Sequence, residues 1–286
     1  MAISRIRCAA MVPEARVIFG TPADQIDVFQ PNRGRLGMFV RFLLAGFVFL
    51  CTCAAPGLAN AACELRVGWD EWPPYFTHER GNFHGLEYDL LKSTADTTGC
   101  KLDFLQVPWV RALKMLGAGE LELLYGAGYA AERAEFARFS IPYRQEQFLL
   151  VTRPKAGDDA DSVSLNDWIR SERAVSDPVT IGVFRGNFYG EQIEGIVRNK
   201  ENNVTLVELN DNDQLIGMLG AGRIDGFIIE DGVAQTELRG SPFPFHRYAI
   251  KEQPADPLHY MFSFGVAEDV VQRFNNAIRE RQSQGR

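Results

Sequence analysis

One stretch of this chain occurs twice, and the spacing of its two copies restricts the fold more than any other feature of the sequence. The segment Met-Leu-Gly-Ala-Gly begins at Met115 and again at Met218, 103 residues later. In each copy, apolar residues at positions i, i+1 and i+4 predict one face of a helix, the glycines predict its end, and the following apolar run predicts a buried strand. Because a period near 100 residues is too long for a solenoid, we expect two similar lobes with a cleft between them.

Strands alternating with helices predict an α/β fold with mainly parallel sheets in both lobes. Two further apolar runs, 147–152 and 258–266, predict strands that cross between the lobes as a hinge, and a closing helix at 268–280 then packs on the first lobe. The expected division is a leader at 1–61, lobe 1 at 62–152, lobe 2 at 153–250, and a return strand with the C-terminal helix at 251–286. The predicted strands are 65–69, 101–107, 121–126, 179–184, 204–208 and 224–229, and the predicted helices between them are 85–98, 109–117, 188–198 and 211–219.

The first sixty residues have the pattern of a secretory signal peptide. Arg41 precedes an apolar run, and Ala59-Asn60-Ala61 is a cleavage site of the A-x-A type. The run is too short for a bilayer span, which needs about 20 apolar residues. We predict cleavage after Ala61. Met38 as the true start, and lipid attachment at Cys51 or Cys53, remain open alternatives.

Two of the five cysteines, Cys63 and Cys100, remain after that cleavage. Each directly precedes a predicted strand, and adjacent parallel strands would place the two residues side by side in an oxidising compartment. A structural disulfide is therefore expected. A redox-active pair is the alternative, but the C-x-x-C spacing is missing.

Composition excludes several classes of function. Without residues 1–61 the chain carries 24 basic and 34 acidic side chains, a net charge of −10, which argues against nucleic acid as a partner. The four histidines are scattered, and no pair has the i, i+4 spacing of a helical zinc site. Gly126-x-Gly128-x-x-Ala131 lacks the acidic partner that a dinucleotide fingerprint needs. No cofactor and no metal are expected.

Ligands of open α/β sheets bind beyond the carboxyl ends of the strands, so the residues that follow each strand are the candidates for a site. In the first lobe these include aromatic and charged side chains, and in the second a glycine-asparagine pair and two acidic residues. The candidates from this rule are Glu71, Trp72, Tyr75, Trp109, Arg111, Gly128, Arg133, Gly186, Asn187, Glu230 and Asp231.

Four motifs follow one another along the chain. They are Trp72-Pro73-Pro74-Tyr75-Phe76, Gly85-Leu86-Glu87-Tyr88-Asp89-Leu90-Leu91, Ala130-Ala131-Glu132-Arg133 followed by Phe139-Ser140-Ile141-Pro142-Tyr143, and Ala221-Gly222-Arg223-Ile224-Asp225-Gly226. Any one motif is weak, but together they cover essentially all of 63–280. This ordered set resembles the polar-amino-acid class of extracytoplasmic solute-binding proteins that serve ABC importers (bacterial extracellular solute-binding protein family 3).

The resemblance implies a type II periplasmic binding protein fold and roles for particular residues. Arg133 would bind a ligand α-carboxylate, because its planar guanidinium offers two parallel charged hydrogen bonds. Glu230 would accept the α-ammonium group, with Asp231 as the alternative. Backbone N–H groups near Gly186 and Asn187 would donate to an anion. Trp72, and with it Tyr75 and Trp109, would stack on the ligand side chain.

Three positions depart from the family pattern. Ala130 replaces a threonine, Asn187 a serine or threonine, and Glu230 an aspartate. These changes leave open a modified amino acid, an opine or another small carboxylate as the ligand. The charges near the ligand side chain do not decide between them, because Asp70 and Glu71 are opposed by Arg111 and Arg185.

The expected function is capture of a small amino-acid-like or carboxylate solute by a monomer in the periplasm of a Gram-negative bacterium, for delivery to an ABC permease, without catalysis. The alternatives are a periplasmic cyclohexadienyl or arogenate-type dehydratase on the same fold, and a ligand-sensing partner of a membrane receptor.

Overall fold

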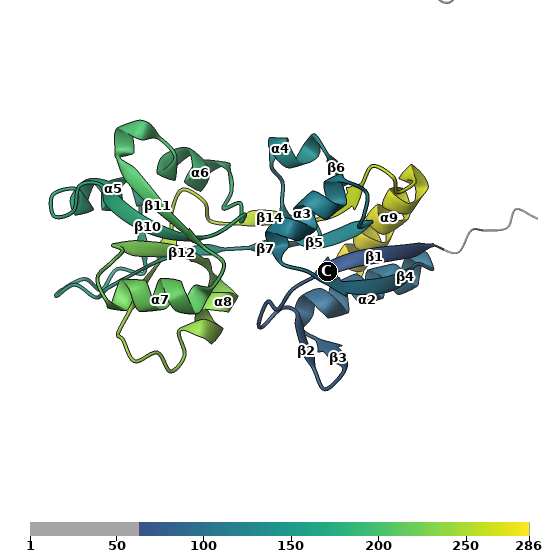
Figure 1. The fold of residues 1–286 in the computed structure, drawn as a ribbon, viewed down its shortest axis with the longest axis horizontal. Helices are drawn as coiled ribbons and strands as arrows, with labels where there is room; N and C mark the ends of the chain where they lie inside the picture. Colours follow the sequence, from purple (N-terminus) through teal and green to yellow (C-terminus); the bar gives the residue numbers. More distant parts are fainter. Residues whose placement is uncertain (1–62, 286) are drawn as a thin grey trace, which may run out of the picture. The chain divides into compact units, whose positions relative to one another are not determined.

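The computed structural model describes residues 63–285, so the predicted signal peptide and the possible start at Met38 lie outside the described residues. The described chain contains two six-stranded sheets and one two-stranded hairpin (Figure 1). Both larger sheets mix parallel and antiparallel pairs, and helices cover both of their faces. This is the two-lobed α/β fold that the sequence predicts.

The first sheet has the strand order β4-β1-β5-β14-β6, with β7 also paired to β14. Helices α2 and α9 pack on one face, and α3 packs on the other. Figure 1 shows β14 and α9, the yellow end of the chain, among the blue elements that begin it. Its elements are β1 (Glu64–Trp69), the hairpin β2 (Thr77–Glu79) and β3 (Asn82–His84), α2 (Leu86–Thr98), β4 (Lys101–Gln106), α3 (Trp109–Gly117), β5 (Leu123–Gly128), α4 (Ala131–Ala134), β6 (Ala137–Phe139), β7 (Arg144–Glu146), β14 (Asp256–Ser263) and α9 (Glu268–Gln284).

The second sheet has the order β11-β10-β12-β8-β13-β9. Helices α5 and α6 contribute to the core on one face, and α7 and α8 to the core on the other. The buried Trp168 belongs to α5, a helix that the sequence patterns did not predict. The elements are β8 (Phe148–Thr152), β9 (Ser162–Val163), α5 (Leu165–Glu172), β10 (Val179–Phe184), α6 (Glu191–Val197), a 3₁₀ turn η1 (Lys200–Asn202), β11 (Val204–Leu209), α7 (Asn212–Gly220), β12 (Gly226–Glu230), α8 (Asp231–Glu237) and β13 (His246–Ile250).

The chain passes between the two sheets at two places in the described residues. One passage joins β7 to β8, and the other joins β13 to β14. The expected outward and return connections are therefore present, but the strands predicted to cross do not do so, since β8 and β14 each pair within one sheet. Strand β8 pairs with β12 and β13, so residues 148–152 lie in the second sheet, whereas the expected division assigns them to lobe 1. The apolar run of β8 is explained by its position between two neighbours inside that sheet.

The repeated segment forms the same turn in both lobes. Helices α3 and α7 end at its first glycine, and its alanine is the C-cap residue. The glycines that follow, Gly119 and Gly222, have φ of 74° and 67°. Those left-handed conformations suit glycine, which explains why the motif contains it there.

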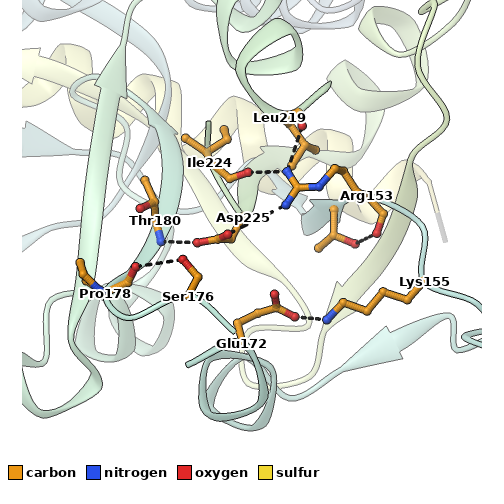
Figure 2. A network of polar contacts seen from close by, with 10 residues as sticks. Arg153, Lys155, Glu172, Ser176, Pro178, Thr180, Leu219, Ile224 and Asp225 are labelled. Carbon is orange, nitrogen blue, oxygen red and sulfur yellow. Dashed lines mark hydrogen bonds and ion pairs between the residues drawn. The ribbon is translucent and has the colours of Figure 1, made fainter. Parts of the chain in front are cut away.

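An acidic residue three positions after each of these glycines binds a neighbouring parallel strand, β1 in the first sheet and β10 in the second. Glu122 accepts the Arg66 N–H at 2.9 Å, and Asp225 accepts the Thr180 N–H at 2.8 Å. Figure 2 shows the second case, in which the Arg153 guanidinium also donates to the carbonyls of Leu219 and Ile224. The duplication therefore extends to the polar contacts that hold helix, turn and strand together.

The predicted disulfide is confirmed. Strands β1 and β4 are parallel with Glu64 opposite Lys101, which places Cys63 and Cys100 side by side with their Cα atoms 4.5 Å apart. On the chain-entropy model, a bridge that joins residues 37 apart stabilises the fold by roughly 3–4 kcal/mol. Within residues 63–285, every helix falls short of the length and hydrophobicity that a membrane span requires.

Candidate ligand-binding site

A cavity of about 470 Å³ is lined by elements of both sheets. The first sheet contributes the loop after β1, the start of α3 and the end of β5, and the second contributes the loops after β10 and β11 and the end of β12. These are mostly carboxyl ends of parallel strands, where the fold class places ligands. Seven of the predicted site residues line it: Glu71, Trp72, Trp109, Gly128, Arg133, Asn187 and Glu230.

Arg133 is a buried cation in this cavity. It lies in the short helix α4 and is 8% exposed. Its Nη1 donates to the Gly128 carbonyl at 3.0 Å and its Nη2 to the Gly186 carbonyl at 2.9 Å, while the Trp109 and Phe188 rings flank the guanidinium at 5.7 and 5.8 Å. Burial lowers its pKa to about 10.

The Arg133 guanidinium has N–H groups without an acceptor and no anion close to it among the described residues. Two of its five N–H groups are used by the carbonyls. Among residues 63–285, no carboxylate lies within 4.0 Å of it. Buried charges are usually paired, so this arrangement suits an anionic group brought by a ligand.

Glu230 presents a carboxylate from the second sheet. It ends β12 and caps α8, where its Oε2 accepts the Val233 N–H at 2.9 Å. Its Oε1 accepts a hydrogen bond of 2.7 Å from the hydroxyl of Tyr75, which belongs to the first lobe. A Cβ on Gly232 would lie 2.2 Å from that hydroxyl oxygen, so glycine is needed for the two groups to meet. Burial raises the pKa of Glu230, and the bonds from Tyr75 and Val233 oppose the rise.

The remaining predicted residues do not line the cavity; they are Tyr75, Gly186, Arg111 and Asp231. Tyr75 donates to Glu230, which lines the cavity. The Gly186 carbonyl accepts the Trp109 Nε1–H at 3.0 Å and an N–H of Arg133, two side chains that line the cavity. Arg111 is exposed and does not line the cavity. Asp231 does not line it either, because its position at the start of α8 leaves Glu230 as the acid that faces the cavity.

The backbone around Gly186 differs from the expected helix opening. Helix α6 begins at Glu191 rather than 188, after Gly190 with φ of 85°. The Asn187 N–H donates to the Phe184 carbonyl at 3.2 Å. In this structure the group of Gly186 that faces Arg133 is its carbonyl.

Three further residues surround the site that the sequence reasoning did not single out: Arg144, Glu146 and Asp256. Arg144 lies over the Tyr75 ring at 4.4 Å and the Trp72 ring at 5.6 Å, and pairs with the fully buried Glu87. Glu146 lines the cavity from β7. Asp256 is paired with Glu146 between β14 and β7. The only signal for them in the sequence was the proximity of residues 144–146 to the first hinge connection.

The cavity is rich in carboxylates. Within the described residues, Arg133 is the single basic side chain in its lining. Against it stand seven acidic side chains: Asp70, Glu71, Glu146, Asp211, Asp213, Glu230 and Glu237. Such a lining attracts cations and repels solutes whose charge is only negative.

The family described as bacterial extracellular solute-binding proteins, family 3, matches residues 65–285. The chain belongs to this family. No curated protein sequence matches it.

Solved structures share the fold of this solute-binding protein at low sequence identity. The substrate-binding protein of an amino acid ABC transporter has 22% identity and a TM-score of 0.60, covering 78% of this chain and 94% of its own. An ancestral arginine-binding protein bound to arginine has 22% identity and a TM-score of 0.62, with coverage of 78% and 93%. An ancestral amino acid-binding protein, a precursor of cyclohexadienyl dehydratase, has 21% identity and a TM-score of 0.59, with coverage of 78% and 90%.

Membership in an extracellular family agrees with the disulfide, which persists in oxidising compartments. Among residues 63–285 of this solute-binding protein, no group of three or more histidine, cysteine or acidic side chains is arranged to hold a metal ion. The cavity of the protein has aromatic walls, one buried cation and several carboxylates.

Proposed function

We propose that the cavity captures a small amino-acid-like solute, with Arg133 binding its carboxylate and Glu230 its ammonium group. The observation that carries the proposal is the buried Arg133 guanidinium, which faces the cavity with free donors and without a carboxylate partner in the described residues. The carboxylate oxygens of Glu230 each accept one hydrogen bond and retain a lone pair for an ammonium donor.

The proposed solute is bound between the lobes and handed to an ABC permease by a monomeric protein in the periplasm. Hydrogen bonds between the lobes support capture by closure. Arg133 and Trp109 of the first lobe donate to the carbonyl of Gly186 in the second. Tyr75 of the first lobe donates to Glu230 of the second. Closing lobes exclude water, which strengthens charged contacts. Presentation of the same complex to a membrane receptor would use the same site.

The test is isothermal titration calorimetry of the purified protein with a panel of amino acids. Charged hydrogen bonds contribute about 1.5–3 kcal/mol each, so an affinity in the low micromolar range or better is expected. Arg133→Met should weaken binding at least tenfold. Arg170→Met, which removes an exposed arginine of α5 outside the cavity, is the matched control. Equal affinities for Arg133→Met and the unmodified protein would remove Arg133 from the site.

A dehydratase activity is the second candidate, because the buried carboxyl of Glu230 has a raised pKa, as a general acid requires. We favour binding without turnover. Mass spectrometry of the bound solute after prolonged incubation distinguishes the two. A solute recovered unchanged supports a binding protein, whereas a dehydrated product would establish an enzyme.

A further inference from the structure

We propose that Glu146 contacts the solute and determines specificity by receiving a second cationic group, so that the cavity selects amino-acid-like solutes with a positive charge besides the α-ammonium. This proposal rests on the proposed function, and it adds a residue of the hinge to the binding site.

Glu146 is a buried carboxylate that faces the cavity without a donor. It lines the cavity from β7 and is only 9% exposed. No hydrogen bond or ion pair within residues 63–285 satisfies its side-chain oxygens, whereas Glu87 receives both Tyr143 and Arg144. Buried charges without partners are unfavourable, and a carboxylate left in this way suits a cationic group that arrives with the solute.

The neighbours of Glu146 increase its need for a cation. Asp256 is its direct partner across the β7–β14 pair, is 6% exposed, and has its Oδ2 atom buried without a partner. Glu230 and Glu87 add negative charge, while Arg144 opposes it. Burial, and after it this crowding of carboxylates, raises the pKa of Glu146 well above its ordinary value.

Charge balance indicates what the solute must carry. A zwitterionic amino acid would place its carboxylate on Arg133 and its ammonium on Glu230, and would leave Glu146 and Asp256 without a counter-charge. An ammonium or guanidinium group at the other end of the solute would supply one. The aromatic side chains Trp72 and Trp109 in the lining suit an organic cation of this kind.

Binding of such a cation should release a proton. In the ligand-free protein burial disfavours the ionised form of Glu146. The negative charges of Glu87 on α2, Glu230 on β12 and Asp256 on β14 add to this effect, whereas Arg144 and Arg133 oppose it. The arriving cation stabilises the ionised form, and the proton passes to the solvent. Affinity for a dibasic solute should therefore increase as the pH rises through the range in which Glu146 titrates.

The test is calorimetry of the full protein and of Glu146→Gln with L-arginine, L-lysine and L-glutamine, in buffers that differ in ionisation enthalpy. We expect Glu146→Gln to weaken the binding of L-arginine or L-lysine at least tenfold and to change the affinity for L-glutamine less than threefold. The variant should also lose the proton release that accompanies binding. The exposed Glu135, changed to glutamine, controls for loss of one negative charge outside the cavity and should have no such effect.

Several results would overturn the proposal. One is that Glu146→Gln weakens the binding of all three solutes equally, which would indicate a structural role for Glu146. Another is unchanged binding of the dibasic pair. If the unmodified protein bound L-glutamine but neither dibasic amino acid, the preference for a second cation would be wrong while amino acid capture stood. Binding of none of the three would count against the proposed function itself.

Discussion

At the scale of single residues, the aromatic wall of the site depends on one buried ion pair. The Glu87 carboxylate is fully buried, accepts the Tyr143 hydroxyl at 2.5 Å and pairs with Arg144. The same Tyr143 oxygen accepts the Gly126 N–H at 2.8 Å, and Arg144 lies over the Tyr75 ring. The pair thus connects the core of the first lobe to the wall of the cavity.

Removing one member of that pair should destabilise the protein more than removing both. Arg144→Met leaves Glu87 buried and unpaired, at a cost of about 3–5 kcal/mol in the free energy of unfolding. The double variant Glu87→Met/Arg144→Met should recover most of that loss, because no uncompensated charge remains. Urea denaturation of the three proteins measures both effects. A single variant that unfolds within 1 kcal/mol of the parent would show that the pair is not needed for stability.

At the scale of elements, each lobe packs a helix closely against a parallel strand at a glycine, Gly68 of β1 and Gly182 of β10. A Cβ on Gly182 of β10 would lie 2.6 Å from Leu215 Cδ2, 2.9 Å from Ile224 Cδ1 and 3.1 Å from Phe227 Cβ, all in buried side chains. Gly68 of β1 has the equivalent contacts in the first lobe. The close approach of α7 and β12 to β10 therefore requires glycine.

Gly182→Ala should lower the free energy of unfolding by about 1–3 kcal/mol through overpacking. Gly217→Ala is the control, since Gly217 lies inside α7 with no atom within 4 Å of the added Cβ. That change should raise the free energy of unfolding by about 0.5–1 kcal/mol, because alanine favours a helix. Thermal unfolding of both variants measures whether the first is less stable than the parent and the second more stable. A stabilising Gly182→Ala would contradict this account of the packing.

The sequence predicts the repeated elements well and the hinge poorly. Long apolar runs with glycine ends identify strands such as β10 and helices such as α2, whose predicted end at residue 98 is observed, with Gly99 as a left-handed cap. Strand β7 has only the three polar residues Arg-Gln-Glu, so it has no apolar pattern to detect. Glu146 meets Asp256 only through strand pairing between positions 110 residues apart, and such a juxtaposition depends on the tertiary fold.

At the scale of the whole molecule, buried carboxyl groups couple stability to pH. Burial raises the pKa of Asp256 to about 6, although Arg133 opposes the rise, and the pKa values of Glu146 and Glu230 are also raised by burial. In contrast, the hydrogen bond from Arg66 lowers the pKa of Glu122 below its ordinary value. The two kinds of group act on stability in different pH ranges.

For a carboxyl group whose pKa is higher in the folded state, the folded protein binds the proton more tightly than the unfolded chain. Its stabilising effect is present at low pH and is lost as the pH rises from the ordinary value of 3.8 to the folded value of about 6. The ligand-free protein should therefore lose free energy of unfolding between about pH 4 and 6. Below that range, protonation of Glu122 should also reduce stability, because its stabilisation exists only in the ionised form.

Asp256→Asn should flatten the decline between pH 4 and 6, since the amide does not titrate and keeps the shape of the side chain. Urea denaturation at half-unit steps of pH measures the slope, with Asp167→Asn, an exposed residue of α5, as the control that should leave it unchanged. A cationic solute bound beside these carboxylates should flatten the slope as well, because it favours their ionised forms in the folded protein. If the parent instead gained stability steadily from pH 4 to 7, with Asp256→Asn following the same curve, the carboxyl groups of the hinge would not hold protons in the folded state.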